Sequence, residues 1–546
     1  MKKLGLISIC TITGLYLLLA VILVLIFSIF EIPVAFGLLI SLVLIVIQFL
    51  IGPFITDITM KLFYKVDFNY ETPDYLRTFI EDTCKEHNMK YPKLGFINDG
   101  APNAFTYGRV KNDARIILSK GIFDLLDEEE IKAVVAHEIG HATHYDMLLM
   151  TVVQMIPLIF LGAANALIRS SSNPKKTTSN SSSKSDSEGI IVLIGLICML
   201  IYIISEYIVL WLSRSREYYA DEFSARTTKK PAALSSALVK IGFGLTTAKV
   251  DKNKKHFVGD NTTLGISDKS SSQAITASAC SFNGEANKVS IKKAMRWDLF
   301  NTWAKWYELN ATHPLVSKRI LELAKYSKEF NQEPYIDFTE KKEKSYVPQF
   351  ALEVFLCIIP TILFIAAIVL FFVVIAVNPN TPLYIIPSAL AVLGMLVSFI
   401  KFFYRHPKNF SDETVESLME RIEVSDMKAI PCKLKGELIG RGDPGCIFNE
   451  DFVILDDTGL VLLNYKQPLK FWDKLFALFG TKKHIGNEVE ITGWFRRNPV
   501  PYIDMLEFKS SGKTKKLYSY ITGLIVRCIF GVIFLVLLIL AAMALL

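Results

Sequence analysis

Long apolar blocks are the feature that most constrains what this chain can fold into. A helix needs about 18 to 20 consecutive apolar residues to cross the roughly 30 Å hydrocarbon core of a bilayer. Seven blocks reach that length, near residues 4–30, 33–55, 147–168, 190–212, 350–377, 383–403 and 521–546. With 51% hydrophobic and 21% charged residues among 546, the chain is not a simple soluble enzyme, a disordered chain or a secreted disulfide scaffold. The sequence therefore predicts a polytopic α-helical membrane protein.

The first block follows Met1, Lys2 and Lys3 and in this respect looks like a signal peptide. Its apolar run is too long for the central region of a signal peptide, and no Ala-x-Ala cleavage pattern follows it. A second apolar block comes at once. We therefore expect a retained membrane anchor that leads directly into a second span.

The distribution of lysine and arginine predicts the orientation of the spans. The segments 56–146, 213–349 and 404–520 are rich in these residues, whereas the turns after the first and fifth blocks carry none. Positive charge concentrates on the cytoplasmic side of membrane proteins, so we expect these segments in the cytoplasm and a multi-pass protein of the plasma membrane. The net charge of +7 includes no dense basic block, so we expect a lipid bilayer and no nucleic acid as partner.

One segment carries the residues for chemistry. Four acidic residues, 127–130, suit a helix N-terminus, and apolar residues follow at helical spacing. His137 and His141 are one helical turn apart, so both imidazoles project from the same face, as two ligands of one zinc ion must. Glu138 lies beside them and is placed to take a proton from an attacking water. The alternative is a charged, solvated helix turn without a metal.

Glu217 is the best candidate for the third ligand. His144 shares the histidine face, but a straight helix places it about 10.5 Å along the axis from His137, too far to close one tetrahedral site. Glu217 follows the fourth apolar block directly, at the membrane boundary where the histidine helix also ends. Asp221 lies one turn beyond Glu217 and is placed to hold a ligating imidazole by its other N–H. A solvated helix carboxylate is the alternative for Asp221.

These residues resemble a known family. The run His-Glu-Ile-Gly-His at 137–141, followed after two spans by Glu-Tyr-Tyr-Ala-Asp at 217–221, is similar to the HtpX and type I CAAX prenyl protease group of membrane zinc metallopeptidases. Residues 102–108 resemble the family's Asn-Ala-x-x-x-Gly segment, and 312–320 resemble its Thr-His-Pro…Arg-Ile motif. The resemblance covers about residues 1–325, and the order of spans looks most like HtpX.

The resemblance implies a gluzincin-like zinc-protease domain on the cytoplasmic side. His137, His141 and Glu217 would bind one zinc ion per chain. Glu138 would act as general base and then as proton donor to the leaving amine. Asp221 would orient one of the histidines.

Substrate contacts are also implied by the resemblance. Asn103 and Ala104 would lie on an edge strand that pairs with an extended substrate, and His313 would stabilise the oxyanion of the scissile carbonyl. On the residues alone, Asn103 is equally well explained as a turn residue after Pro102, and His313 as a helix-start residue before Pro314.

Glu206 lies deep inside the fourth apolar block, where a charge is costly and usually faces inward. It precedes Glu217 by 11 residues, about three turns, so both share one helix face. We expect a polar contact beneath the catalytic residues or a pairing with Gln154 of the third block, with neither favoured. The polar, aperiodic stretch 248–290 is expected to be a mobile insertion.

Residues 350–546 extend beyond the part that resembles the family. Inside them, short apolar runs at 452–455, 460–463 and 489–497 alternate with turn signals, which predicts a small β-rich, OB-like cytoplasmic domain. This domain resembles the membrane-flanked domain of GIDE-type ubiquitin ligases, but it has no RING cysteines and no ligase activity is inferred. We expect it to present substrates or to support oligomerisation.

The predicted organisation is two N-terminal spans (1–56), a catalytic segment with the edge strand and histidine helix (57–146), a pair of spans (147–212), a catalytic segment with the third ligand (213–345), a span hairpin (350–404), the β-rich module (411–515) and a last span (521–546). We expect an integral-membrane zinc endopeptidase that cleaves misfolded membrane proteins or unfolded polypeptides at the cytoplasmic face. A prenyl-protein protease and a catalytically inactive membrane scaffold are the alternatives, and assembly into a homo-oligomer stays open.

Overall fold

The computed structural model describes residues 34–172, 184–247, 288–338, 344–377, 384–441, 451–468, 471, 484–510 and 512–543. The chain divides into two compact units. Of the described residues, those up to 247 and 308–337 form the first unit, and 288–307 with those from 338 onward form the second. The first predicted span lies outside the described residues, as does most of the insertion expected at 248–290.

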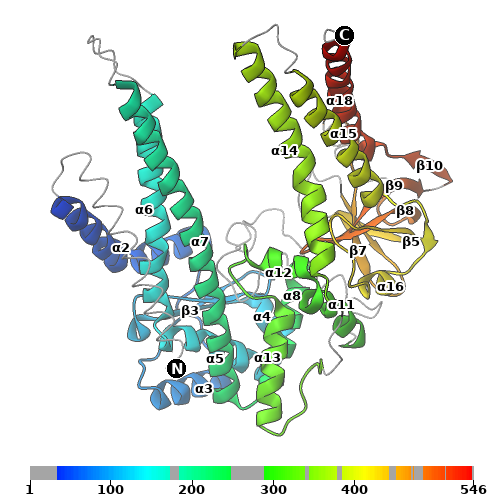
Figure 1. Ribbon diagram of the computed structural model, residues 1–546. Helices are drawn as coiled ribbons and strands as arrows, with labels where there is room; N and C mark the ends of the chain where they lie inside the picture. The colour runs from blue at the N-terminus through cyan, green and yellow to red at the C-terminus, as the bar shows by residue number, and fades with distance from the viewer. Residues whose placement is uncertain are drawn as a thin grey trace. The chain divides into compact units, whose positions relative to one another are not determined.

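The first unit is mostly helical and contains one small sheet (Figure 1). Its elements are α2 (Val34–Phe63), α3 (Asp74–Glu86), β1 (Lys93–Ile97), β2 (Ala104–Tyr107), the 3-10 turn η1 (Lys111–Asp113), β3 (Arg115–Ser119), α4 (Lys120–Leu125), α5 (Glu128–Thr143), α6 (Asp146–Ser172), α7 (Lys184–Thr228), α8 (Pro231–Thr247) and α13 (Val316–Glu329). Helices α6 and α7 pack along each other through an apolar core that includes Val153, Phe160 and Leu212.

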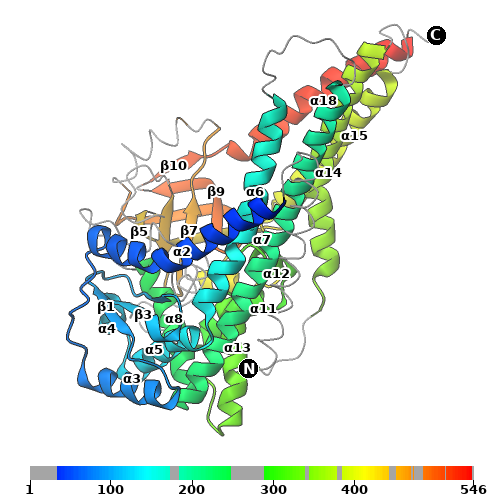
Figure 2. The same ribbon diagram turned by 90° about the vertical axis from the view of Figure 1, so that its left-hand side faces the viewer.

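Strand β3 lies in the middle of the three-stranded sheet, with β1 parallel on one side and β2 antiparallel on the other. All five side chains of β3 are buried, and its one charged residue, Arg115, pairs with Asp57 of α2 (Nε to Oδ1, 3.2 Å). Figure 2 shows the sheet beside α3, α4 and α5. Strands β1 and β2 are therefore the two edge strands, and β2 contacts α5, the helix that carries the two histidines.

Helix α5 begins where its acidic residues predict. Asp127 caps it by accepting a hydrogen bond from the N–H of Glu130 (2.9 Å), and the Glu130 carboxylate accepts one from the N–H of Asp127 (3.0 Å). This reciprocal capping box satisfies two N–H groups that a helix start leaves unpaired. The Glu130 carboxylate also accepts hydrogen bonds from Ser236 (2.6 Å) and Lys240 (2.8 Å) of α8, so the start of α5 is held against α8.

Helix α7 packs closely against the middle of α5. The Ser224 hydroxyl donates to the Ala133 carbonyl at 2.6 Å. Gly140 permits this approach, because a Cβ at its position would stand 3.1 Å from the Cβ of Phe223 and 3.2 Å from the Cα of Ala220. The glycine between the two histidines thus lets α7 come within reach of the histidine face.

Five helices in the described part of the chain are long and apolar enough to cross a membrane. The segments are Asp146–Asn165, Gly189–Thr228, Val347–Val377, Ile385–Arg405 and Ser519–Leu537. They coincide with the last five apolar blocks of the sequence. Helix α2 covers the second block and is not among the five, so a total of seven spans stays a prediction.

The second unit combines helices with a larger sheet. Its helices are α11 (Lys288–Phe300), α12 (Thr302–Glu308, whose last residue belongs to the first unit), α14 (Val347–Val377), α15 (Ile385–Arg405), α16 (Val415–Met419) and α18 (Ser519–Met543). Its strands are β4 (Ser411–Asp412), β5 (Ile430–Arg441), β6 (Phe452–Leu455), β7 (Leu460–Asn464), β8 (Glu488–Arg497), β9 (Pro501–Ser510) and β10 (Lys513–Lys516).

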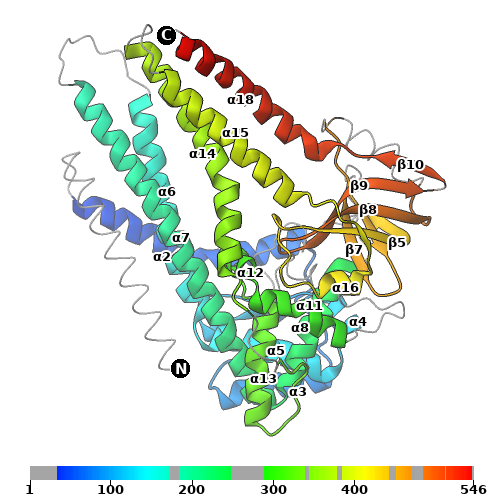
Figure 3. The same ribbon diagram turned by 45° about the vertical axis from the view of Figure 1, so that its right-hand side comes forward.

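Five of these strands close into a ring. Strand β5 pairs with β6, β6 with β7, β7 with β9 in parallel, β9 with β8, and β8 back with β5. The buried side chains inside form one apolar core that includes Leu434, Phe452, Leu463, Ile491 and Ile503. The ring is a small β-barrel, and Figure 3 shows its strands next to the ends of α15 and α18. The OB-like character of this barrel stays a prediction.

Replacing Gly140 with valine is expected to destabilise the protein. The branched side chain would push α7 away from α5, and overpacking of this kind costs about 1–3 kcal/mol. Thermal unfolding of the purified protein, followed by tryptophan fluorescence, measures the loss. Gly162→Val is the matched control, since a Cβ at Gly162 of α6 would meet nothing within 4 Å. Equal melting temperatures for the two variants would contradict the close approach of the helices.

Candidate metal centre

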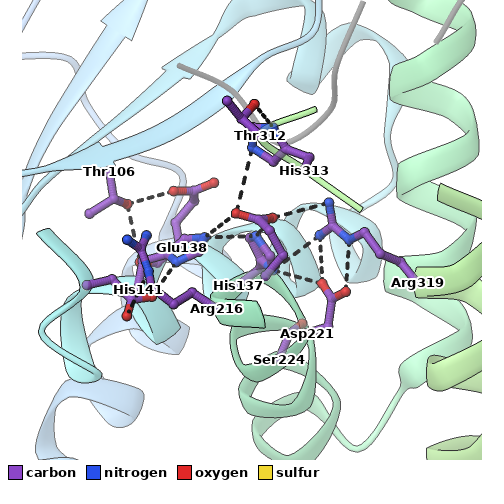
Figure 4. Close-up of polar contacts among 12 residues, drawn as sticks. Thr106, His137, Glu138, His141, Arg216, Asp221, Ser224, Thr312, His313 and Arg319 are labelled. Atoms are coloured by element: carbon purple, nitrogen blue, oxygen red, sulfur yellow. Dashed lines mark hydrogen bonds and ion pairs between the residues drawn. The ribbon is translucent and has the colours of Figure 1, made fainter. Parts of the chain in front are cut away.

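Helices α5 and α7 bring three metal-binding side chains together (Figure 4). His137 and His141 project from one face of α5, and their Nε2 atoms are 3.2 Å apart. Glu217 reaches this pair from α7, with Oε2 3.5 Å from Nε2 of His137 and Oε1 3.5 Å from Nε2 of His141. One atom from each of the three lies within 4.8 Å of the others, so the structure places the two histidines and the predicted third ligand in one cluster.

The spacing of this cluster suits a small tetrahedral ion. Zinc–nitrogen and zinc–oxygen bonds of about 2.0–2.2 Å at tetrahedral angles separate neighbouring ligand atoms by roughly 3.3–3.6 Å. The side chains of His137 and Glu217 are only 1% and 6% exposed. Oε2 of Glu217 accepts no hydrogen bond from a described residue, and its nearest cation is the Arg319 guanidinium, with Nη1 at 3.4 Å. A buried carboxylate oxygen that accepts no hydrogen bond is costly, and a metal ion at the centre of the three ligand atoms would satisfy it, so these residues fit a bound metal.

The Nδ1 atom of His137, which does not face the other ligands, contacts a buried ion pair between Asp221 and Arg319. This nitrogen lies 2.9 Å from Oδ1 of Asp221. Arg319 of α13 holds Asp221 through two hydrogen bonds, from Nε to Oδ2 at 2.8 Å and from Nη2 to Oδ1 at 2.7 Å, and the arginine is fully buried. A carboxylate on Nδ1 keeps the proton there and leaves Nε2 free, which is the tautomer a metal requires.

His141 has an equivalent arrangement. Its Nδ1 donates to Oδ2 of Asp146 at 2.8 Å, and this carboxylate, the first residue of α6, is buried. Arg216 of α7 lies 3.1 Å from the other oxygen of Asp146. Each imidazole therefore has a carboxylate and an arginine behind it, and both Nε2 atoms face Glu217.

A hydrogen bond from strand β2 orients the Glu138 side chain. Its Oε2 accepts a hydrogen bond from the Thr106 hydroxyl at 2.7 Å, and the same hydroxyl lies 3.2 Å from the Glu138 carbonyl. The glutamate is 2% exposed. Thr106 thus fixes the direction of this carboxylate between the histidine helix and β2.

His313 reaches the cluster from the segment before α13. Its Nε2 lies 3.7 Å from Oε1 of Glu217, and the Thr312 hydroxyl lies 2.9 Å from its Nδ1. The side chain is 10% exposed, and Figure 4 shows it above His137. The structure therefore brings His313 to the edge of the histidine–glutamate cluster, although it follows the end of α5 by 170 positions in the sequence.

Asn103 and Ala104 lie at the start of the edge strand. The N–H of Asn103 donates to the Ser119 hydroxyl at 2.7 Å, and its carbonyl accepts a hydrogen bond from the N–H of Ser119 at 3.0 Å. Ala104 is the first residue of β2 and is fully buried. Their contact with a substrate stays a prediction.

His144 and Glu206, which the sequence analysis also considers, lie outside the cluster. His144 packs against Tyr219 and Phe223, and its burial lowers the pKa of its imidazole. Glu206 is half-buried in α7 and forms no hydrogen bond or ion pair with any residue that the structure describes. Among the described residues, neither the polar contact expected beneath the catalytic residues nor the pairing with Gln154 is found for Glu206.

Sequence reasoning assigned no role to four residues that shape the centre, namely Thr106, Asp146, Arg216 and Arg319. Thr106 and Arg319 lie inside the segments that carry the family resemblance. Asp146 stands alone at the entry to an apolar block, five residues after His141, and a carboxylate there is the signal that could have identified it.

The site and the similarity to known proteins define the family of this chain. The histidine helix with its glutamate and the long apolar helices are those of a membrane-type metalloprotease. A family model described as Peptidase family M48 matches residues 71–327. The chain belongs to peptidase family M48, and it is HtpX-like.

Two relatives show the extent of the likeness. A protease HtpX homolog of Methanothermobacter thermautotrophicus is 35% identical over 197 residues, which cover 36% of this chain and 69% of that protein. A homolog of Aquifex aeolicus is 33% identical over 194 residues, which cover 34% and 62%. The crystal structure of Ste24p from S. mikatae aligns with 59% of this chain and 67% of the Ste24p chain, at 17% identity and a TM-score of 0.33, which is too low to support an argument.

The family match ends at residue 327, before α14, so the β-barrel lies outside it.

Removing the charge of either carboxylate that contacts a histidine Nδ1 is expected to weaken metal binding. Asp146→Asn and Asp221→Asn keep the shape of the side chain but lose its charge, and partners of this kind are worth about 10–100-fold in metal affinity. Competition with a chromophoric zinc chelator measures the change. Asp124→Asn, at a carboxylate that is 58% exposed, is the control, and an affinity equal to the control in both variants would contradict the assigned contacts.

Metal affinity is also expected to rise with pH. Burial lowers the pKa of His137, but the hydrogen bonds to Asp221 and Glu217 outweigh it and raise the pKa to about 9. A metal binds only the neutral ring, so below this pKa the ion must displace a proton, and apparent affinity increases about tenfold per pH unit. The same competition assay between about pH 6.5 and 8.5 tests this; a flat profile would contradict it.

Proposed function

We propose that this chain is an integral-membrane zinc endopeptidase that hydrolyses peptide bonds at the cytoplasmic membrane face in membrane-protein quality control. The observation that carries the proposal is the cluster of His137, His141 and Glu217. The histidines come from α5, which ends just before the candidate span of α6, and the glutamate comes from the last third of the candidate span of α7. Two imidazoles and a carboxylate at tetrahedral spacing form the ligand set of catalytic zinc sites, which keep one position for water or substrate. Zinc is therefore the ion that we assign.

The same helices support a position of the centre near the membrane boundary. Helix α5 ends at Thr143, and the candidate span of α6 begins at Asp146, which itself contacts His141. This supports a centre close to the water boundary rather than at mid-bilayer. The lysine- and arginine-rich segments on either side favour the cytoplasmic face of the plasma membrane.

The contacts of the side chains support a role for each of them. Bound zinc would lower the pKa of water and polarise the scissile carbonyl. Glu138, adjacent to His137 in α5, is placed to take the proton of the attacking water and pass it to the leaving amine. Thr106 directs that carboxylate by its 2.7 Å hydrogen bond. His313, with Nε2 at the edge of the cluster, is placed to donate a hydrogen bond to the oxyanion.

Strand β2 supports an extended polypeptide as the substrate. An edge strand presents main-chain N–H and C=O groups, and an extended segment that pairs with it is recognised by backbone more than by side chains. Thr106 of this strand contacts Glu138, so a segment paired with β2 would pass beside the general base. Recognition of backbone suits misfolded membrane proteins and unfolded chains, which share no sequence.

Glu138→Gln is expected to abolish proteolysis while metal binding persists. The amide cannot accept the proton, and loss of a general base costs about 10²–10⁴-fold in rate. Cleavage of casein and of a misfolded membrane protein by the purified full chain, with zinc content measured in parallel, tests this. Glu129→Gln is the matched control, because Glu129 lies on α5 with a side chain that is 43% exposed.

The same assay separates the alternatives. Equal cleavage by the wild type, the chelator-treated protein and Glu138→Gln would contradict the protease assignment and favour an inactive scaffold. Cleavage confined to a prenylated peptide, with casein and the membrane protein intact, would point to a prenyl-protein protease instead. Chelator-sensitive cleavage of the unprenylated substrates is the result that we expect.

A further inference from the structure

A cavity of about 330 Å³ lies in the second unit, where the end of α15 and the start of α18 meet the β-barrel. It is lined from α15, α18 and the barrel, and the residues used below are Lys401, Arg405, Lys466, Trp494, Tyr520 and Arg527. Both helices are candidate membrane spans, and their barrel ends therefore define a boundary between bilayer and water.

The lining of this cavity carries an excess of positive charge. Four cationic side chains face it, from Lys401, Arg405, Lys466 and Arg527, whereas Asp504 is the only carboxylate among the lining residues. The Asp504 carboxylate is already engaged, by Arg496 at 2.7 Å and by Asn464 at 2.9 Å.

An unpaired positive charge is most costly at Lys401 and Arg527, because both lie within candidate membrane spans. Within the described ranges, neither has a carboxylate within ion-pair distance, and the Lys401 ammonium approaches only the carbonyl and sulfur of Cys357, at 3.4 and 3.9 Å. Arg405, by comparison, has Asp426 at 3.5 Å. Arg527 lies eight residues after the start of α18 at Ser519, about 12 Å along the helix axis. A charge at that depth in a span is costly unless it is paired.

Aromatic rings surround the same cavity. Trp494 and Tyr520 are in contact, with ring centroids 5.0 Å apart, and Tyr520 stacks on Phe402 at 6.0 Å. Tryptophan and tyrosine concentrate at the level of the lipid head groups in membrane proteins. The neighbouring turns of the helices expose Phe403 and Ile525, which are 62% and 52% exposed, so apolar surface for acyl chains adjoins the charged cavity.

His406 adds no charge to this site at neutral pH. Burial, together with Arg496 and Arg405 nearby, lowers the pKa of its imidazole to about 4. Its Nδ1 donates to the Phe402 carbonyl at 3.0 Å. The positive charge of the cavity thus comes from lysine and arginine alone.

We propose that this cavity binds the phosphate of an anionic phospholipid, with Lys401 and Arg527 as its principal contacts. Basic pockets between membrane helices at the head-group level are suited to such lipids, and hydrogen bonds from lysine and arginine to phosphate are charge-assisted and strong. The exposed apolar faces of α15 and α18 accept the acyl chains. The bound lipid joins the barrel to the two spans, independently of the protease centre in the first unit.

Native mass spectrometry of the full-length protein in detergent tests this proposal. The probes are phosphatidylglycerol, phosphatidylcholine with the same acyl chains, and glycerol 3-phosphate, each titrated separately. We expect one phosphatidylglycerol to bind on the order of tenfold more tightly than phosphatidylcholine, and the variant Lys401→Gln/Arg527→Gln to lose that preference.

Two controls keep the result interpretable. The matched variant Lys433→Gln/Lys435→Gln removes the same charge from exposed residues of β5 outside the cavity and is expected to bind as the wild type does. The exchange Lys401→Arg/Arg527→Lys preserves the charge and is expected to retain the preference, which excludes misfolding as the cause of a loss. Equal phosphatidylglycerol binding by the wild type and Lys401→Gln/Arg527→Gln would overturn the proposal. Glycerol 3-phosphate binding as tightly as the lipid would overturn the lipid assignment in favour of a soluble phosphate.

Discussion

Close packing between α5 and α7 determines where each metal-binding side chain stands. Two of them, His137 and His141, belong to α5, and Glu217 belongs to α7, so their 3.5 Å separations exist only while the helices remain in contact. Gly140 removes the side chain that would hold the helices apart, and the Ser224 hydroxyl ties α7 to the α5 backbone. Helices α6 and α7 both contain candidate spans, so the arrangement of membrane helices and the geometry of the metal centre depend on each other.

The two buried carboxylates that contact the Nδ1 atoms of the histidines, together with their arginine partners, act as positioning groups. Asp221 with Arg319 and Asp146 with Arg216 form two buried pairs, and such pairs often stabilise a protein less than apolar residues of the same volume would. Each carboxylate, however, accepts from an Nδ1 and so directs an Nε2 toward Glu217. These four residues are explained by what they do to the histidines rather than by the stability of the fold.

Local signals account for the part of the structure that the sequence predicts well. The cap at Asp127 and the spacing of His137 and His141 are encoded within a few turns of one helix, and the alternating runs that form β6, β7 and β8 are encoded in the same way. The position of Glu217 beside the histidines depends on more distant parts of the chain, because two antiparallel spans must return it to the same depth. The contact of Arg319 with Asp221 joins residues 98 positions apart and depends on how α13 packs, which periodicity does not specify. Closure of the barrel likewise depends on the parallel pairing of β7 with β9, a non-local register.

X-ray absorption spectroscopy of the purified full-length protein, loaded with one equivalent of zinc, tests the central claim most directly. The account predicts a shell of nitrogen and oxygen ligands at about 2.0–2.1 Å, with outer-shell scattering from two imidazoles. It also predicts that Glu217→Ala loses the tightly bound ion. Sulfur scattering at about 2.3 Å, or an unchanged spectrum from a variant without His141, would contradict it.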